Sequence, residues 1–324
     1  MSEVAVTAAL PGSALERLAR RHAVRVRGRG PALAGRQLAE FAGQADALVC
    51  LLADRVAAEV FALCPRLVVV ANYAVGVNNI DLEAARTSGV WVTNTPDVLT
   101  DATADLAWSL ILAVARRVVE GDRLVRSGSF SGWRPDLLLG AGLQGKTLGI
   151  VGMGRIGRAV ARRASGFGMW VCYHSRTQAP PLEGAGAEYI PDLEALLARS
   201  DVLSLHCPLT HQTRHLLDER RLCLLPAGAI VVNTSRGEVV DEAALARVLE
   251  SGRLGGAGLD VYEREPEVHR ALLGRDDVVL LPHLGSATRE ARQAMADLVV
   301  DNVLAVLDGK PPLTPVIRPL VPRR

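Results

Sequence analysis

The feature that most constrains the fold is a glycine-rich turn in "LGIVGMGRIGRAV", residues 148–160. An apolar segment, predicted to be a buried strand, precedes this turn, and a predicted helix follows it. Gly152 permits the turn, Gly154 lets a ligand approach the backbone, and Gly157 lets the helix pack closely on the strand. The free N–H groups at the start of the helix then face an anion. We therefore predict a dinucleotide phosphate site, with a plain structural turn as the alternative.

The segment after the next predicted strand bears on which dinucleotide binds. Sites for NAD usually carry an aspartate or glutamate about 20 residues beyond the turn, but this chain has "HSRT" at residues 174–177. A carboxylate would repel a 2′-phosphate, whereas the guanidinium of Arg176 and the hydroxyls of Ser175 and Thr177 would bind one. The pattern favours NADP(H), and the alternative is an exposed arginine in a site that still uses NAD(H).

Two stretches of the chain alternate short apolar strands with helices, which predicts βαβ units on parallel sheets. The first hundred residues are predicted to contain strands at 3–10, 46–52 and 67–73 and a helix from Ser13 to Arg21. The alternation resumes between residues 146 and 281. With 324 residues the chain is long enough for two domains, and with 4% aromatic residues its cores must be built from Ala, Val and Leu.

A long helix is predicted at residues 100–127, where Thr100 and Asp101 are candidate caps and Gly128 is a candidate stop. This helix is apolar nearly all round until its basic end, so we expect a second domain and a second subunit to cover it. A last helix is predicted at 288–308. The proline-rich tail after it is expected to run over the surface as an extended arm.

Two segments, residues 65–89 and 227–252, share one pattern: an apolar strand, a polar loop with glycine, an aspartate, and an alanine-rich helix that ends in Ser-Gly. The repetition predicts two domains of similar winding. We expect each segment to place its loop at the carboxyl end of a strand, where ligands of open α/β sheets bind.

Composition argues against several other functions. The formal net charge is only +2, and no basic run with interleaved aromatic residues predicts nucleic-acid binding. The apolar run "LAWSLILAVA" is too short to span a membrane, and the first residues do not match a secretory signal. The five cysteines form no C-x-x-C pair, which predicts reduced thiols in the cytoplasm. His211 and His215 lie four residues apart with no glutamate of a zinc-protease helix between them, so no metal site is predicted.

Five motifs occur in order along the chain: "NTPDVLTDATADLAWSLILAVARR", "LGIVGMGRIG", "VNTSRGEVVDEAAL", "GLDVYEREP" and "PHLGSAT". Together they resemble the D-isomer-specific 2-hydroxyacid dehydrogenase family over nearly the whole chain. "SGWRP", "YHSRT" and "HLGSAT" are most similar to its glyoxylate/hydroxypyruvate reductase branch. The resemblance implies an α/β fold of two Rossmann-like, doubly wound domains. A flavodoxin-like substrate domain would comprise residues 1–99 and 288–324, and an inserted NAD(P)-binding Rossmann domain residues 100–287.

The resemblance implies three catalytic residues, Arg236, Glu265 and His283. Arg236 would clamp the carboxylate and carbonyl oxygens of a 2-keto acid and polarise its C=O bond. His283 would donate a proton to the developing alkoxide, because imidazolium is a good acid near neutral pH. Glu265 would hold the imidazole ring and favour its charged form. Each residue taken alone has an ordinary alternative, as a surface charge, a loop carboxylate or a loop histidine.

The resemblance also implies residues that support binding, with ordinary turn chemistry as the alternative for each. The backbone N–H groups of Val75 and Gly76 would receive the substrate carboxylate, with Leu52 nearby, and Ser286 would bond near His283. Trp133 would reach across a dimer into the partner's pocket and limit substrate size, unless it is a hydrophobic loop anchor. The implied cofactor contacts are Thr103, Gly152, Met153, Gly154, Arg155, Ile156, Gly157, Ser175, Arg176, Thr177, Cys207, Pro208, Thr213, Thr234, Ser235, Arg236, Asp260, His283 and Gly285.

The function implied by this resemblance is NADP(H)-dependent reduction of small 2-keto acids, glyoxylate or hydroxypyruvate, to D-2-hydroxy acids by a homodimer. One alternative keeps the fold and changes the substrate to 3-phosphoglycerate, formate or phosphite. The other is a corepressor-like protein that senses a dinucleotide and acts through a partner. The intact set of three catalytic residues favours turnover.

Overall fold

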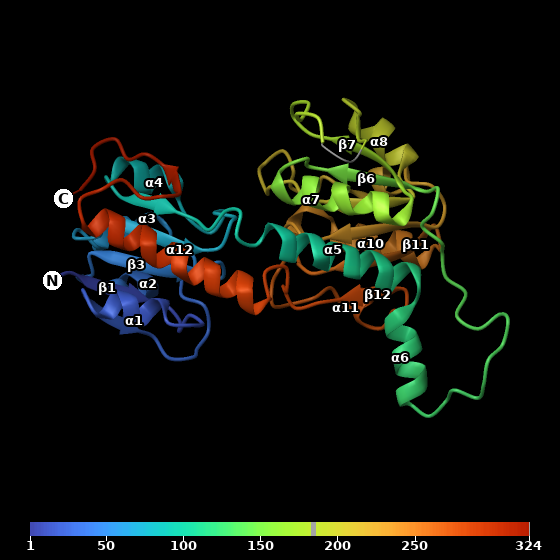
Figure 1. The fold of residues 1–324 in the computed structure, drawn as a ribbon, viewed down its shortest axis with the longest axis horizontal. Coiled ribbons are helices and arrows are strands. Elements are labelled where there is room, and N and C mark those ends of the chain that lie inside the picture. The colour runs from blue at the N-terminus through green and yellow to red at the C-terminus, as the bar shows by residue number, and fades with distance from the viewer. Residues whose placement is uncertain (183–185, 324) are drawn as a thin grey trace. The chain divides into compact units, whose positions relative to one another are not determined.

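The computed structural model describes residues 1–182 and 186–323, which form two compact units (Figure 1). Unit 1 comprises Met1–Leu99 and Ser286–Arg324, and unit 2 comprises Thr100–Gly285. The second limit therefore lies two residues before the position expected from the sequence. Each unit is built on a mainly parallel sheet with helices on its faces, so the predicted α/β fold class is confirmed.

Unit 1 has the strand order β13-β5-β4-β3-β1-β2. The strands β1 to β5 are parallel and follow the flavodoxin-like order 2-1-3-4-5. These strands are β1 (Glu3–Val6), β2 (Ala23–Val26), β3 (Ala47–Leu51), β4 (Val69–Tyr73), β5 (Trp91–Thr93) and β13 (Pro315–Ile317). The helices are α1 (Ala14–Ala19), α2 (Gly35–Ala42), α3 (Ala58–Leu63), α4 (Leu82–Thr87) and α12 (Arg289–Leu307). The strands and helices predicted in this unit are present, and all of them are shorter than expected.

The expectation of an extended C-terminal arm over the surface was wrong for part of the tail. Strand β13 joins the sheet antiparallel to β5, where a proline is tolerated because the strand lies at the edge. Thr314 holds the start of this strand. Its N–H donates to the buried Asn302 of α12 (2.9 Å), and its hydroxyl donates to the carbonyl of Asn94 after β5 (2.6 Å). These contacts join two segments far apart in the sequence, which periodicity cannot reveal.

Unit 2 has the strand order β12-β11-β10-β9-β6-β7-β8, all parallel, which is the Rossmann order 3-2-1-4-5-6 with one further strand. The strands are β6 (Thr147–Val151), β7 (Trp170–His174), β8 (Glu188–Tyr189), β9 (Val202–Leu205), β10 (Ala229–Asn233), β11 (Leu254–Leu259) and β12 (Val278–Leu280). The α-helices are α5 (Thr100–Ala115), α6 (Val118–Arg126), α7 (Arg155–Ala164), α8 (Leu193–Arg199), α9 (Glu219–Leu222), α10 (Glu242–Glu250) and α11 (Arg270–Leu273), and the 3-10 turns are η1 (Ser165–Phe167) and η2 (Gly237–Val239). Strands β9 and β10 are buried throughout, as expected of a parallel sheet covered on both faces.

The single helix predicted at 100–127 is two helices, α5 and α6, and this prediction was wrong. The carbonyl of Ala115 accepts the N–H of Ala141 (2.7 Å) and so does not continue the helical ladder. Arg117 then adopts a left-handed φ of 53° and pairs with Glu120. Within its own unit, α5 packs on α7 and on strands β10, β11 and β12, and Gly128 follows the end of α6. The apolar surface of α5 is therefore covered by its own domain, and the predicted last helix is present as α12.

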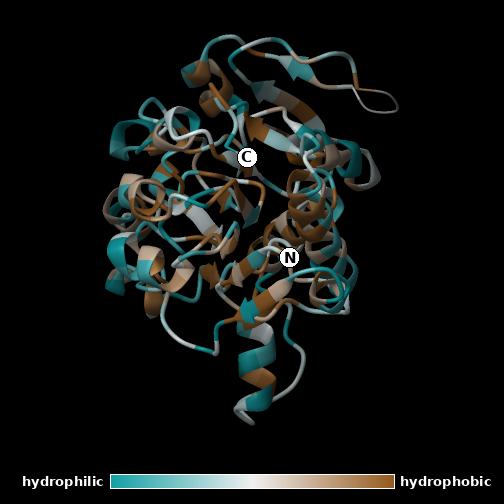
Figure 2. Cartoon of the chain, turned by 90° about the vertical axis from the view of Figure 1, so that its left-hand side faces the viewer, coloured by the Kyte–Doolittle hydropathy of each residue, from teal (hydrophilic) through white to brown (hydrophobic). Residues whose placement is uncertain are grey.

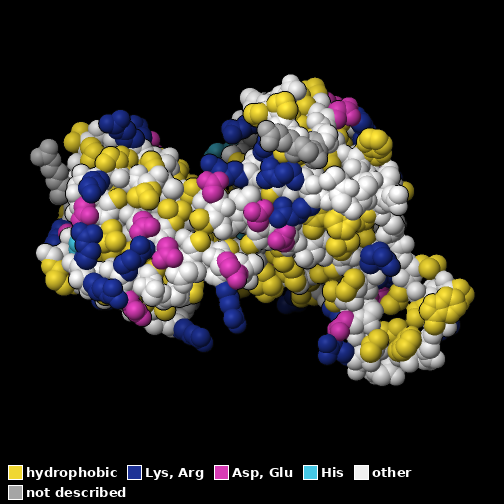
Figure 3. Space-filling view, viewed as in Figure 1, with side chains coloured by type: hydrophobic (Ala, Val, Ile, Leu, Met, Phe, Trp, Pro, Cys, Tyr) yellow, Lys and Arg dark blue, Asp and Glu magenta, His cyan; other side chains and the backbone are white. Residues whose placement is uncertain are grey.

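Helix α6 and the loop after it, residues 118–142, project from unit 2 and are called the arm below (Figure 1). Hydrophilic and hydrophobic residues alternate along α6 (Figure 2), and none of its residues is buried. Hydrophobic side chains gather on the surface of this arm (Figure 3). The large exposed ones are Val118, Val125, Phe130, Trp133 and Leu139. Among the helices of the described residues, none is long and apolar enough to cross a membrane.

Candidate active site

The glycine-rich turn joins β6 to α7 at the point where the strand order of unit 2 reverses. At two of its glycines there is no room for a side chain. A Cβ on Gly152 would lie 2.6 Å from the nitrogen of Cys207, and one on Gly157 would lie 2.1 Å from the carbonyl oxygen of Gly152. At Gly154 a Cβ would meet nothing within 4 Å, and no side chain caps α7 there. The open position and the uncapped N–H groups fit the pyrophosphate of a dinucleotide.

The loop after β7 carries the residues predicted to recognise the 2′-phosphate. Arg176 and Thr177 are exposed, whereas the hydroxyl of Ser175 donates to the carbonyl of Thr177 (2.6 Å). From α7, Arg158 donates to the carbonyls of Pro180 and Pro181 (2.7 and 3.1 Å) and so holds the end of this loop. The loop is therefore fixed to the same helix whose N-terminus carries the glycine turn.

The loop after β9 carries Cys207, Pro208 and Thr213. The hydroxyl of Thr213 donates to the carbonyl of Pro208 (2.7 Å) and closes this loop. Burial raises the pKa of the Cys207 thiol to about 11, so it remains protonated. The preceding residue, His206, has no partner that the sequence reveals, yet its Nε2 lies 2.8 Å from the Ser204 hydroxyl. Burial lowers the pKa of His206 to about 4, which makes it a neutral group beside the turn.

Arg236 lies on the loop after β10, and the asparagine that ends this strand shapes the loop. The amide of Asn233 donates to the carbonyl of Arg236 (2.8 Å), and its oxygen accepts the N–H and the hydroxyl of Ser235 (3.0 and 2.8 Å). Burial lowers the pKa of the Arg236 guanidinium, while the carboxylates of Glu265 and Glu238 raise it. Arginine remains charged under such conditions. The loop thus holds a cation at the carboxyl edge of the sheet.

Thr234, on the same loop, was predicted to contact the cofactor. Its hydroxyl is buried, and it has no hydrogen-bond partner among the described residues. A buried hydroxyl of this kind normally has a partner. The unsatisfied Thr234 hydroxyl and the open position at Gly154 are both consistent with a cofactor bound along this edge of the sheet.

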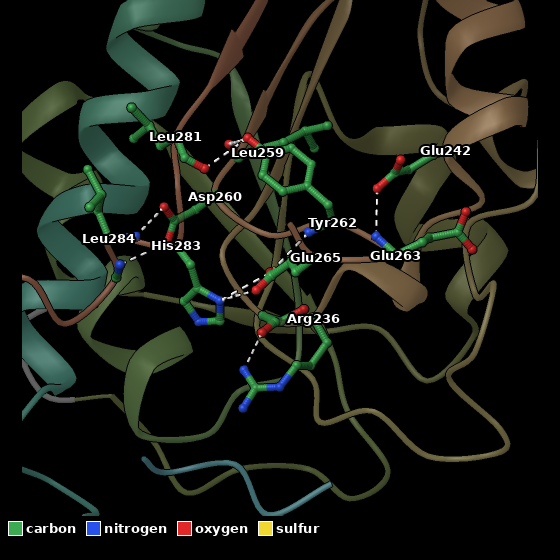
Figure 4. Close-up of polar contacts among 12 residues, drawn as sticks. Arg236, Glu242, Leu259, Asp260, Tyr262, Glu263, Glu265, Leu281, His283 and Leu284 are labelled. Atoms are coloured by element: carbon green, nitrogen blue, oxygen red, sulfur yellow. Dashed lines mark hydrogen bonds and ion pairs between the residues drawn. The ribbon is translucent and has the colours of Figure 1, made fainter. Parts of the chain in front are cut away.

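Glu265 and His283 lie on the loops after β11 and β12, and the structure brings them together (Figure 4). The Nδ1 atom of His283 lies 2.9 and 3.1 Å from the two carboxylate oxygens of Glu265. Burial raises the pKa of Glu265, but the hydrogen bond and charge of His283, the N–H of Tyr262 and the charge of Arg236 outweigh it, so that the pKa lies below its ordinary value. An ionised Glu265 accepts a hydrogen bond from His283 only if Nδ1 carries a proton. Because Nδ1 faces the carboxylate, the other ring nitrogen, Nε2, points away from it.

The residues around His283 fix its backbone in a left-handed conformation with φ of 55°. Asp260 accepts the N–H groups of Leu284 and Gly285 (2.6 and 2.8 Å), and its own carbonyl accepts the N–H of His283 (2.9 Å). Thr103, near the start of α5, donates to the carbonyl of Gly285 (3.0 Å). Asp260 and Thr103, both predicted cofactor contacts, therefore hold the loop that carries His283.

Sequence reasoning missed two further residues of this site, Tyr262 and Glu242 (Figure 4). Tyr262 donates its hydroxyl to the carbonyl of Leu281 (2.8 Å) and its N–H to Glu265 (3.2 Å). The buried carboxylate of Glu242 accepts the N–H groups of Glu263 and His269 (2.7 and 3.2 Å), on either side of Glu265. Tyr262 lies inside the motif "GLDVYEREP", and this position could have marked it as part of the site. Glu242 cannot be distinguished by sequence from any other acidic residue in the first turn of a helix.

The remaining predicted residues lie elsewhere. Leu52, Val75, Gly76 and Ser286 belong to unit 1, where the loops after the neighbouring strands β3 and β4 carry the first three. Trp133 lies on the arm and is 81% exposed. Unit 2 thus gathers Arg236, Glu265 and His283 at the ends of three adjacent strands, β10, β11 and β12. No group of three or more metal-ligating side chains occurs in the described residues.

The chain is similar to known proteins in sequence. Residues 108–285 match the model of the D-isomer specific 2-hydroxyacid dehydrogenase, NAD binding domain. The glyoxylate reductase of Thermococcus kodakarensis is 48% identical over 324 residues, covering 98% of this chain and 97% of the relative. That of Thermococcus litoralis is 54% identical over 280 residues, covering 85% and 84%.

Solved structures are similar over the whole chain. A protein from Thermus thermophilus is 49% identical with a TM-score of 0.92, covering 97% of this chain and 100% of its own. The NADPH-dependent glyoxylate/hydroxypyruvate reductase of Sinorhizobium meliloti, solved with NADP and malonate, is 36% identical with a TM-score of 0.88, covering 100% and 99%. These similarities in sequence and structure show that the chain belongs to the D-isomer specific 2-hydroxyacid dehydrogenase family of NAD(P)-binding oxidoreductases.

Proposed function

We propose that this enzyme reduces small 2-keto acids, glyoxylate and hydroxypyruvate, to D-2-hydroxy acids and prefers NADPH. The hydrogen-bonded pair of His283 and Glu265, with the Arg236 cation close enough to lower the pKa of Glu265, is the observation that carries this function. Relatives named glyoxylate reductase, and a similar reductase solved with NADP and malonate, support the substrate class and the cofactor.

Arg236 binds the substrate. Its planar guanidinium has several N–H donors, which suit a carboxylate and a neighbouring carbonyl oxygen held in one plane. As the carbonyl carbon is reduced, negative charge develops on that oxygen, and a fixed cation stabilises it more than it stabilises the ground state. The N–H groups of Val75 and Gly76 would also bind the substrate carboxylate, with Leu52 on the neighbouring loop.

His283 supplies the proton. Glu265, ionised because its pKa is lowered, accepts Nδ1–H and stabilises the imidazolium, so that Nε2–H can be donated to the developing alkoxide. The bound cofactor supplies the hydride. After the proton has left Nε2, the ring is neutral and Nδ1 still donates to Glu265, so the carboxylate keeps its charge throughout.

In the proposed mechanism, unit 2 holds the cofactor. The N–H groups at Gly154 and at the start of α7 bind the pyrophosphate, and the loops that carry Cys207, Thr213 and Thr234 line the nucleotide. The exposed guanidinium of Arg176, on the loop after β7, would supply the cation that a 2′-phosphate requires, and this supports a preference for NADPH.

We also propose that the enzyme is a cytoplasmic homodimer that pairs through the arm. The arm exposes Phe130, Trp133 and Leu139 together, and exposed apolar patches of this kind mark interaction sites. Trp133 would then enter the pocket of the partner and limit substrate size. Light scattering should report a dimer. Trp133→Ser should weaken this dimer or admit larger 2-keto acids to the pocket. A monomeric wild-type enzyme would refute the pairing.

The cytoplasmic location is supported by the free cysteines, which fit a reducing compartment.

The direct experiment follows the near-ultraviolet absorbance of NADPH, and in parallel of NADH, with glyoxylate, hydroxypyruvate, pyruvate and 3-phosphohydroxypyruvate. We expect the fastest oxidation of NADPH with one of the first two acids. Oxidation with none of the four, despite measurable NADPH binding, would favour a dinucleotide-sensing protein and refute the reductase.

A further inference from the structure

The loop that follows β4 in unit 1 is held by the segment that follows β5. The carbonyl of Ala74 accepts the backbone N–H of Thr95 (2.9 Å), and the carbonyl of Val75 accepts the side-chain amide of Asn94 (2.8 Å). The carbonyl of the next residue, Gly76, accepts the amide of the fully buried Asn72 (2.8 Å). Three successive carbonyls are thus fixed by donors within the body of unit 1.

The direction of these carbonyls determines the direction of the N–H groups. In a planar trans peptide, the C=O of one residue and the N–H of the next point in opposite directions. The N–H of Val75 therefore faces away from Thr95, and the N–H of Gly76 faces away from Asn94. Among the described residues neither N–H donates to a protein acceptor. Both residues are partly exposed, so the two N–H groups are available to a ligand.

Asn94 is itself held in place on its other side. Its carbonyl accepts the hydroxyl of Thr314 (2.6 Å), and the buried Asn302 of α12 donates to the same hydroxyl (2.8 Å). A neutral amide is also the suitable donor at this position, because a carboxylate there would repel both the Val75 carbonyl and an incoming anion.

We infer that Asn94 is a positioning residue for the substrate: by fixing the Val75 carbonyl, it turns the Gly76 N–H, beside that of Val75, toward the substrate carboxylate. This inference rests on the proposed function, in which these two N–H groups bind that carboxylate. Asn94 is also the contact that mutation can remove, because the neighbouring contact from Thr95 is made by backbone. Without the amide, the Val75–Gly76 peptide is free to rotate and loses its orientation toward the ligand.

The test compares Asn94→Leu with the wild-type enzyme in three measurements. We expect the KM for glyoxylate and the inhibition constant of oxalate, a small competing carboxylate, each to rise about tenfold, which corresponds to about 1.4 kcal/mol. We expect kcat and the dissociation constant of NADPH to change by less than about threefold, because the group acts on the substrate carboxylate alone. Asn94→Ser, which is smaller and polar, should move the same quantities in the same direction if the leucine variant does not fold.

Tyr73→Phe is the matched control. It removes a hydrogen bond at the end of β4, the strand that leads into this loop, from the Tyr73 hydroxyl to the carbonyl of Arg292 (2.6 Å), without touching the loop carbonyls. This control should lower the melting temperature and leave the KM and the oxalate constant unchanged. An unchanged oxalate constant in both Asn94 variants, or an equal rise in Tyr73→Phe, would overturn the positioning role while wild-type turnover still supports the proposed function. A wild-type enzyme that reduces no 2-keto acid would refute both.

Discussion

The segments 65–89 in unit 1 and 227–252 in unit 2 are built alike. Each has a buried strand whose asparagine donates to a carbonyl of the following loop, both at 2.8 Å: Asn72 to Gly76 in unit 1 and Asn233 to Arg236 in unit 2. Each loop then leads to a helix whose N-terminus is capped by an aspartate, Asp81 for α4 and Asp241 for α10, both at 2.9 Å. The shared sequence pattern therefore does correspond to a shared local structure.

The two loops differ in what they present to a ligand. The loop of unit 2 presents a side chain, the guanidinium of Arg236. The next residue, Gly237, lies so close to the backbone of Tyr262 that a Cβ on Gly237 would be 1.8 Å from the carbonyl carbon of Tyr262. The loop of unit 1 presents two backbone N–H groups, of which that of Gly76 depends on Asn94 for its direction. In the proposed function, one scaffold thus supports two kinds of anion recognition, of which residue type reveals only the first.

Arg236→Ala should reduce activity the most, because the N–H groups that would bind the substrate are in the Arg236 side chain. We expect kcat/KM for glyoxylate to fall by about 10³-fold, in the range found when a donor to a developing oxyanion is removed. Val75→Ala, on the other loop, should leave kcat/KM within about twofold, because the backbone N–H remains. Steady-state rates of both variants test the comparison, which fails if the valine variant loses as much as the arginine variant.

Gly237→Ala tests the close approach that brings the loops of unit 2 together. A methyl group there cannot fit beside Tyr262 unless the loop that carries Glu265 moves, so we expect a loss of about 1–3 kcal/mol in unfolding free energy and a fall of about 10²-fold in kcat. Gly142→Ala, where a Cβ meets nothing within 4 Å, is the control for stability. Denaturant unfolding and glyoxylate turnover of both variants give the result, and an equally stable Gly237→Ala would contradict the close packing.

Arg176→Ala lies in neither segment and separates cofactor effects from substrate effects. We expect the KM for NADPH to rise about tenfold and that for NADH to stay within about twofold, because only NADPH carries the 2′-phosphate. The KM for glyoxylate should not change. If the two cofactors respond equally, Arg176 does not recognise the phosphate.

The smallest expected effect concerns stability: Glu265→Gln should change how the melting temperature depends on pH. The pKa of Glu265 is lowered in the folded protein, so its charge stabilises the fold above the ordinary pKa and this contribution is lost as pH falls through the folded value. We expect the wild-type enzyme to melt about 2–4 °C above the variant near pH 7, and this difference to shrink as the pH is lowered below about 4. Melting curves of both proteins across this range decide the matter, and a difference that grows in acid would contradict the lowered pKa.

The sequence predicts those parts of the molecule that depend on neighbouring residues or on residue type. The alternation of strands and helices gives the fold class, and the glycine turn stands where the strand order reverses. Arg236, Glu265 and His283 are recognisable by charge and motif, and the structure places the last two in contact. Their catalytic roles remain proposals.

The features that the sequence does not predict depend on contacts between distant segments. The break between α5 and α6 follows from a backbone hydrogen bond between Ala115 and Ala141. In the sequence, Arg117 and Glu120 resemble an ordinary ion pair on a helix surface and so do not indicate a break. Strand β13 depends on Thr314 meeting residues 94 and 302. The roles of Asn94 and Tyr262 likewise arise from bonds to residues about 20 positions away. Local patterns contain no signal for such pairs.

The proton-donor role of His283 is tested most directly by NADPH oxidation with saturating glyoxylate, measured side by side for the wild-type enzyme and His283→Ala. The imidazole is the proposed proton donor and lies against Glu265 on unit 2. We predict that the variant still binds NADPH with wild-type affinity but turns over about 10²–10⁴-fold more slowly. Turnover by His283→Ala at the wild-type rate would contradict the mechanism.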